Sequence, residues 1–176
     1  MIRAILAAAL VAWAHAAWAG TYHTKEEALR LAFPGADRVD TRTLYLTETQ
    51  AREVETLSGA RLEGRVYTFY VGLREGKPLG YAAIEAATVR TLPQTLLVVL
   101  GPDLRVRSVR VLAFFEPEEY LPPERWLAQF RGRGLDPDLR VGGGIQGITG
   151  ATLSAQAVTR QVRRVLALAR LLGSET

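Results

Sequence analysis

The 176-residue chain contains no cysteine, and it has only two histidines and two lysines. Without cysteine, disulfide bonds, thiolate-bound metals, iron–sulfur clusters and covalently attached c-type haem are excluded. The histidines, His15 and His23, both lie near the N-terminus, so we expect neither a Ser–His–Asp triad nor a metal site. Any chemistry that this chain carries out would therefore be expected to use a borrowed cofactor.

The remaining composition is that of a folded globular protein, with 48% hydrophobic and 23% charged residues. Its length suits one ordinary domain. The formal charge of +4 is slight, and the basic residues are almost all arginines scattered along the chain. Because binding of nucleic acid usually needs a dense basic patch, we expect no nucleic-acid partner.

The first residues, "MIRAILAAALVAWAHAAWAG", have the order of a secretory signal peptide. One basic residue, Arg3, precedes an apolar run, and Ala17-Trp18-Ala19 forms a small-x-small cleavage site. The apolar run is shorter than the roughly 20 residues of a spanning helix. We expect residues 1–19 to be removed and residues 20–176 to be exported as one domain, to the periplasm or the outer face of the cytoplasmic membrane.

Helical and strand patterns alternate along the chain. Capping boxes predict helices after Thr24 and Thr47. The segments 65–86 and 95–116 each hold two runs rich in Val, Tyr, Phe or Leu around a turn, which predicts four strands of one antiparallel sheet. Pro122-Pro123 precede a short helix, whose apolar side carries Trp126, Leu127 and Phe130.

The last long segment, residues 153–172, has the period of an amphipathic helix. Its apolar positions recur every three or four residues, at Ala155, Val158, Val162, Val165, Ala169 and Leu172. We expect Arg160, Arg163 and Arg164 on its surface. The fold class predicted is α+β, a small antiparallel sheet with packed helices and this C-terminal helix.

The stretch "VGGGIQGITGATLS", residues 141–154, contains two motifs. Gly142, Gly144 and Gly147 have the spacing of a dinucleotide-binding turn, but a polar stretch precedes them and no second strand follows the helix. We therefore interpret these glycines as a loop.

The second motif, Thr149-Gly150-Ala151-Thr152, lies where the loop becomes the helix. In the simplest interpretation Thr149 or Thr152 only caps the helix. Alternatively, the free backbone N–H groups of Leu153, Ser154 and Ala155 bind a phosphate at the positive end of the helix dipole. Gly150 and Ala151 would leave room for the ligand, and the Ser154 hydroxyl would donate a further hydrogen bond.

The segment "TGATLSAQAVTRQVRRVLALA" resembles the FMN-binding domains related to the C subunit of sodium-translocating NADH:quinone reductase and the G subunit of Rnf complexes. Members carry an S/T-G-A-T motif before a C-terminal helix. The segments "GKPLGYAAIEA" and "FFEPEEYLPPERWLAQF" are similar to family regions, so the resemblance covers roughly residues 61–172. It implies FMN joined through a phosphoester bond to Thr152 by a flavin transferase.

The resemblance also implies an electron-transfer component rather than a stand-alone enzyme, with a membrane or periplasmic redox partner such as a reductase or a cytochrome. Thr149, Gly150, Ala151, Leu153, Ser154 and Glu116 would join Thr152 in binding FMN. Family members usually have Asp three residues before the motif, where this chain has Gln146.

Three alternatives stay open from the sequence. FMN can bind without a covalent bond, or the domain can be a non-redox interaction module whose motif is a helix cap. Glu116, with Glu118 and Glu119, can equally belong to an exposed loop and an acidic helix start. We interpret Tyr120 and Trp126 as core or lid residues rather than flavin stackers.

Overall fold

Capping boxes fix the starts of the first two helices. The computed structural model describes residues 24–173. In it, α1 (Lys25–Ala32) follows Thr24, and α2 (Glu48–Ser58) follows Thr47; each threonine hydroxyl accepts the backbone N–H three residues later. Both predicted helices are confirmed. The predicted signal peptide and its cleavage site lie outside the described residues.

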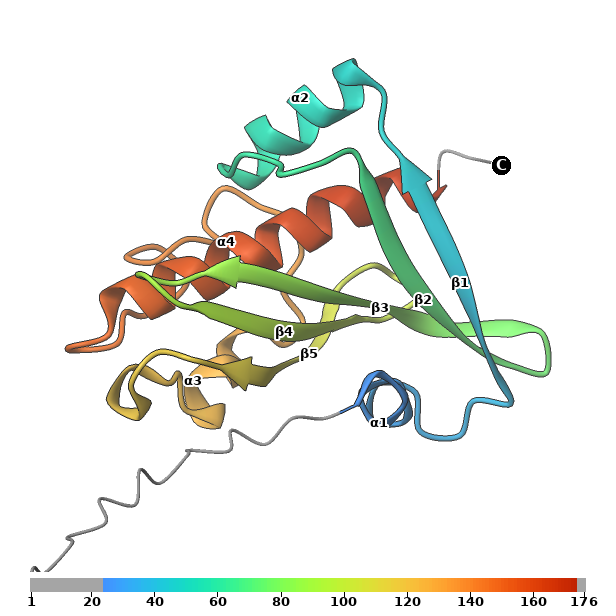
Figure 1. The fold of residues 1–176 in the computed structure, drawn as a ribbon. Helices are drawn as coiled ribbons and strands as arrows, with labels where there is room; N and C mark the ends of the chain where they lie inside the picture. The colour runs from blue at the N-terminus through green and yellow to red at the C-terminus, as the bar shows by residue number, and fades with distance from the viewer. Residues whose placement is uncertain (1–23, 174–176) are drawn as a thin grey trace, which may run out of the picture.

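The strands form one antiparallel sheet in chain order (Figure 1). The predicted four are confirmed as β2 (Val66–Arg74), β3 (Lys77–Thr88), β4 (Pro93–Leu100) and β5 (Val106–Phe114). A fifth, β1 (Arg38–Tyr45), was not predicted; it pairs with β2 from Arg38 opposite Leu73 to Tyr45 opposite Val66. This edge strand is mostly exposed, so it lacks the alternation of buried and exposed residues that identifies a strand.

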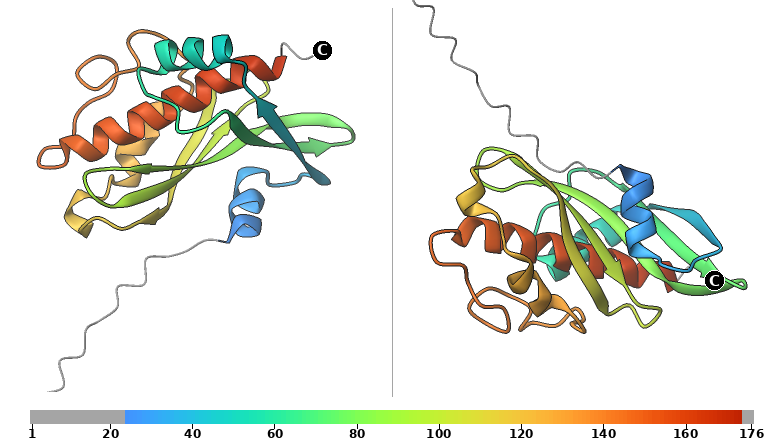
Figure 2. Two further views of the ribbon diagram at one scale, coloured as in Figure 1. Left: turned by 45° about the horizontal axis from the view of Figure 1, so that its top comes forward. Right: turned by 90° about the horizontal axis from the view of Figure 1, so that it is seen from below.

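Helices cover both faces of the sheet, and the inner strand β4, between β3 and β5, is buried on both sides. Leu96, Val98 and Leu100 face the C-terminal helix α4 (Thr152–Ala169), whereas Leu97 and Val99 face α1. The two helices lie on opposite faces (Figure 2). The continuous apolar run of β4 thus supplies two cores, one for each face.

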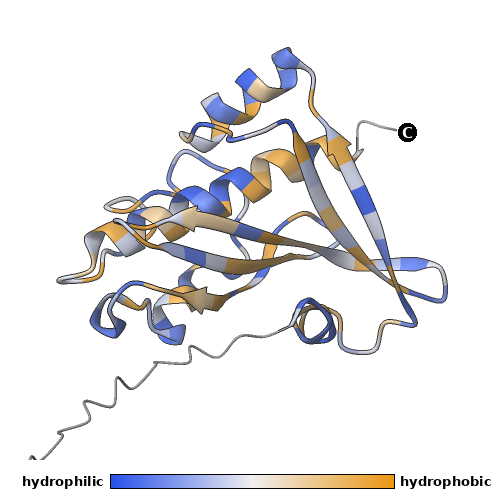
Figure 3. Cartoon of the chain, viewed as in Figure 1, coloured by the Kyte–Doolittle hydropathy of each residue, from blue (hydrophilic) through white to orange (hydrophobic). Residues whose placement is uncertain are grey.

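Helix α4 packs along the sheet, and hydrophilic and hydrophobic residues alternate along its length (Figure 3). All six apolar positions predicted for the buried side are buried. The prediction that Arg164 lies on the surface is wrong, because its side chain is only 10% exposed and binds the Glu85 carboxylate of β3. Arg160 is exposed, and Arg163 is half-buried.

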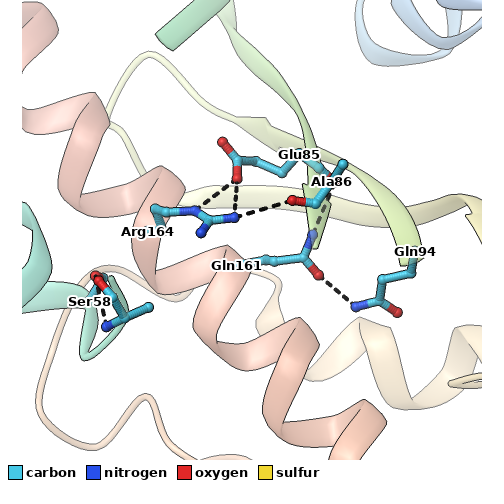
Figure 4. Close-up of polar contacts among 7 residues, drawn as sticks. Ser58, Glu85, Ala86, Gln94, Gln161 and Arg164 are labelled. Atoms are coloured by element: carbon cyan, nitrogen blue, oxygen red, sulfur yellow. Dashed lines mark hydrogen bonds and ion pairs between the residues drawn. The ribbon is translucent and has the colours of Figure 1, made fainter. Parts of the chain in front are cut away.

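A chain of buried polar contacts joins α4 to β3 and β4 (Figure 4). Arg164 Nε donates to Glu85 Oε2 at 2.8 Å. One turn earlier, Gln161 Nε2 donates to the Glu85 carbonyl at 3.0 Å, and Gln161 Oε1 accepts from Gln94 Nε2 at 2.6 Å. These bonds set how α4 lies along the sheet, and thereby where its N-terminus is placed.

The segment after β5 folds into short helical turns, η1 (Glu118–Tyr120), α3 (Glu124–Leu127) and η2 (Ala128–Phe130), and η3 (Arg170–Gly173) follows α4. The predicted apolar residues Trp126, Leu127 and Phe130 are all buried. Between residues 24 and 173, no helix has both the length and the apolar character that crossing a membrane requires. That same part of the chain holds no cluster of three or more acidic or histidine side chains suited to a metal ion.

Candidate functional site

A pocket of about 240 Å³ lies at the N-terminus of α4. Three segments that are far apart in the sequence line it: the turn after β3, the segment after β5 and the start of α4. Its lining residues are Val89, Arg90, Glu116, Tyr120, Gly150, Ala151, Thr152, Leu153 and Ser154. These segments meet at one end of the molecule, on the left in Figure 1.

Six of the seven residues proposed from the sequence therefore line one pocket: Glu116, Gly150, Ala151, Thr152, Leu153 and Ser154. The seventh, Thr149, is exposed and is not part of the lining. Thr152 is exposed, whereas Ser154 is buried at the base of the helix.

The first turn of α4 has no side-chain cap. The N-cap residue is Ala151, and no side chain makes a cap hydrogen bond there. The interpretation of Thr149 or Thr152 as a simple helix cap is therefore wrong. With Ala151 at the N-cap, Thr152 stands at the first helical position, and among the described residues its hydroxyl has no hydrogen-bond partner.

Three backbone N–H groups of this turn, those of Thr152, Leu153 and Ser154, find no acceptor within residues 24–173. The N–H of Ala155, which we expected to be free, donates to the Ala151 carbonyl at 3.1 Å. No acidic residue lies in the first turn. Unpaired N–H groups and the helix dipole together favour an anion at this position.

Gly150 is needed for the backbone conformation of this turn, and the lack of a side chain does not enlarge the pocket. Its φ is +81°, and no atom lies within 4 Å of where a β-carbon would stand. Residues with side chains rarely adopt this conformation. The expectation that Gly150 provides room for the ligand is therefore wrong. Glycine is required here because the chain adopts a left-handed conformation between the loop and the helix.

Glu116 anchors one wall of the pocket. Its Oε1 accepts the backbone N–H groups of Arg90, Thr91 and Leu92, at 3.0, 2.7 and 2.8 Å. The hydrogen bonds from Leu92 and Thr91 hold the pKa of the Glu116 carboxyl below its usual range. The ionised side chain therefore fixes the turn between β3 and β4, and the interpretation of Glu116 as part of a merely exposed loop is wrong.

Gln146 lies in a loop that is held from the side by α3 and η2. The Trp126 indole N–H donates to the Gln146 carbonyl at 2.7 Å, and the Gln146 N–H donates to Gln129 Oε1 at 2.9 Å. Trp126 is 7% exposed and packs edge-on against Phe130, with ring centroids 5.5 Å apart. Trp126 is thus a core residue that positions the loop before the motif.

Sequence reasoning missed Val89 and Arg90, and it did not place Tyr120 in the pocket wall. Among the described residues that line the pocket, Arg90 alone is a cation. No local motif marks these residues. The turn at residues 90–92 is held at the pocket by its hydrogen bonds to Glu116, which is 24 to 26 residues away in the sequence.

A scan against protein-family models finds no family model that matches this chain, and a search of the curated proteins finds no matching protein.

Proposed function

We propose that this chain is an exported electron-transfer protein that binds FMN in the pocket at the start of α4. The observation that carries the proposal is the uncapped first turn. There, three backbone N–H groups and the Thr152 hydroxyl border a pocket that two distant segments complete.

The phosphate of FMN suits the N-terminus of α4. The N–H groups of Thr152, Leu153 and Ser154 would donate to it, and the dipole of an 18-residue helix favours its charge. Arg90 adds a positive charge to the lining. The Glu116 carboxylate adds a negative one, but its Oε1 is surrounded by three backbone N–H groups.

The size of the pocket suits partial burial of the cofactor. Its volume of about 240 Å³ is below the roughly 300–1,000 Å³ of sites that enclose a whole drug-sized ligand. We propose that the phosphate and the adjoining chain lie inside, with the ring system over Leu153, which is 47% exposed. An exposed ring would be accessible to a redox partner.

Bound FMN would supply the redox chemistry, and the residues of this chain would bind and orient it. Glu116 would hold the turn at residues 90–92, and Trp126 would hold the loop before the motif. We propose a membrane or periplasmic partner, such as a reductase or a cytochrome, and a flavin transferase that forms a phosphoester bond at Thr152.

Co-expression with a flavin transferase tests the covalent attachment. We expect the denatured protein to fluoresce under ultraviolet light on a gel, and we expect Thr152→Val to abolish this fluorescence. Thr149→Val is the matched control, since Thr149 is exposed and outside the pocket lining. A band without fluorescence would exclude covalent attachment, and fluorescence retained in Thr152→Val would exclude this site.

Non-covalent binding of FMN is the second candidate, and Gln146 favours it. Where the flavinylation pattern usually has a carboxylate, this chain has a neutral amide. In this case, flavin absorbance would accompany the folded protein and leave it on denaturation, and Thr152→Val would weaken FMN binding without abolishing it.

A further inference from the structure

The outer edge of β5 is open over most of its length. In the described part of the chain, β5 pairs with β4 only. Its other side makes backbone hydrogen bonds at the first residue alone, where Val106 bonds to Arg133 and Gly132. From Arg107 onward the edge therefore offers backbone N–H and C=O groups to a further strand.

A groove of about 350 Å³ runs along this edge, between residues 107–111 and the segment 121–131, which includes α3 and η2. Arg107, Arg110 and Arg131 line it, against a single carboxylate, that of Glu124. Arg107 donates to the Leu79 carbonyl at 2.5 Å. Across residues 24–173, the guanidinium groups of Arg110 and Arg131 have no hydrogen-bond or ion-pair partner, unlike those of Arg107 and Arg133.

We propose that this groove docks an extended acidic segment of a partner protein, which adds to the sheet as a strand beside β5. Main-chain hydrogen bonds to the open edge would provide affinity, as in other cases of strand addition. Carboxylates of the added strand would meet the unpartnered Arg110 and Arg131, so the charge of the groove selects an acidic segment.

The open edge distinguishes this occupant from an anionic lipid surface, which can pair with the arginines but not with the backbone of a strand. The inference goes beyond the proposed function and requires no bound FMN. The groove and the pocket at α4 are nevertheless neighbours, because Leu121 lines the first and Tyr120 the second.

The test uses the full chain without flavin and a fluorescent peptide of alternating valine and glutamate. We expect saturable binding by fluorescence anisotropy, together with amide NMR shifts at residues 107–111. The double variant Arg110→Glu, Arg131→Glu should weaken binding by about tenfold or more, since two attractive charge pairs become repulsive. A variant with Arg42→Glu and Arg160→Glu is the matched control. It changes the net charge equally, at two exposed arginines on β1 and α4 outside the groove, and should bind as the unchanged chain does.

Three outcomes would overturn the proposal. Equal binding of a peptide with the same charges but N-methylated backbone amides would mean that no strand is added. Binding of vesicles containing phosphatidylglycerol, with none of the peptide, would assign the arginines to a lipid surface. A concentration-dependent dimer that broadens the same amides without peptide would assign the edge to a second copy of this chain.

Discussion

The Glu116 carboxylate accepts three backbone N–H groups, so the turn at residues 90–92 depends on a single side chain. Glu116→Gln replaces a charged acceptor with a weaker neutral one. We expect a lower melting temperature at neutral pH and weaker FMN binding, measured by circular dichroism and flavin fluorescence. Glu119→Gln, an exposed position in the same segment, is the control and should change neither.

The pH dependence of this difference follows from the lowered pKa of Glu116. A carboxyl whose pKa is lower in the folded than in the unfolded state stabilises the fold above its ordinary pKa. That contribution is lost as the pH falls through the lowered value. We therefore expect the melting temperatures of the unchanged chain and of Glu116→Gln to converge in acid. A difference that is constant across the acid range would contradict this role of the ionised carboxylate.

Sequence reasoning identified most of the residues that line the pocket but not what each one does. The pattern around Thr152 predicted a helix start with an anion-binding turn. It left open whether a threonine caps that helix, because capping depends on the backbone angles of Ala151, which no local pattern determines. It could not reveal the bonds of Glu116 either, since these join residues that only the folded sheet brings together.

The buried ion pair of Glu85 on β3 and Arg164 on α4 joins two elements, and a double-mutant cycle can measure its coupling energy. Burial raises the pKa of Glu85 despite the nearby guanidinium of Arg164, so the ionised pair carries a desolvation cost. We expect Glu85→Leu or Arg164→Met alone to lower the free energy of unfolding by about 3–5 kcal/mol, because each leaves a buried charge unpaired. The double variant should recover most of this loss, as urea unfolding would measure.

The exposed pair of Glu48 and Arg52 on α2 provides the control for this cycle. Its N–O distance is 2.8 Å, but both side chains are more than 60% exposed. Such surface pairs contribute about 1 kcal/mol or less. A coupling energy between Glu85 and Arg164 no larger than that of the α2 pair would show that burial does not set the strength of the inner contact.

Among the elements, the helices and the strands β2 to β5 were predicted more readily than the edge strand β1. Capping boxes at Thr24 and Thr47 and the apolar run of β4 are local signals, and each gave the correct element. The residues of β1 gain their strand conformation from pairing with β2, which is a long-range contact. Arg164 was misplaced for a similar reason, because its burial depends on where β3 lies against α4.

At the scale of the whole molecule, the sheet positions the turn after β3 and the segment after β5 at the same end as the start of α4 (Figure 1). The polar contacts of Gln161 and Arg164 tie α4 to the same strands. The lining of the pocket therefore comes together only when strands β3 to β5 and α4 are assembled. A ligand that binds there should stabilise the complete fold rather than one loop.

This coupling predicts that FMN raises the melting temperature of the flavin-free chain. At a concentration 100-fold above its dissociation constant, a ligand specific for the folded state adds about 2.7 kcal/mol. For a chain of this size, each kcal/mol raises the melting temperature by roughly 2–4 °C. We therefore expect an increase of about 5–10 °C, measured by calorimetry with added FMN.

Riboflavin is the informative comparison, because it has the same ring system but no phosphate. If the first turn of α4 binds the phosphate, riboflavin at the same concentration should give a much smaller increase than FMN. Thr152→Val keeps the three backbone N–H groups, so it should keep most of the FMN effect when no covalent bond forms. Equal increases with FMN and riboflavin would place the flavin elsewhere, since the N-terminus of α4 would then contribute nothing to its binding.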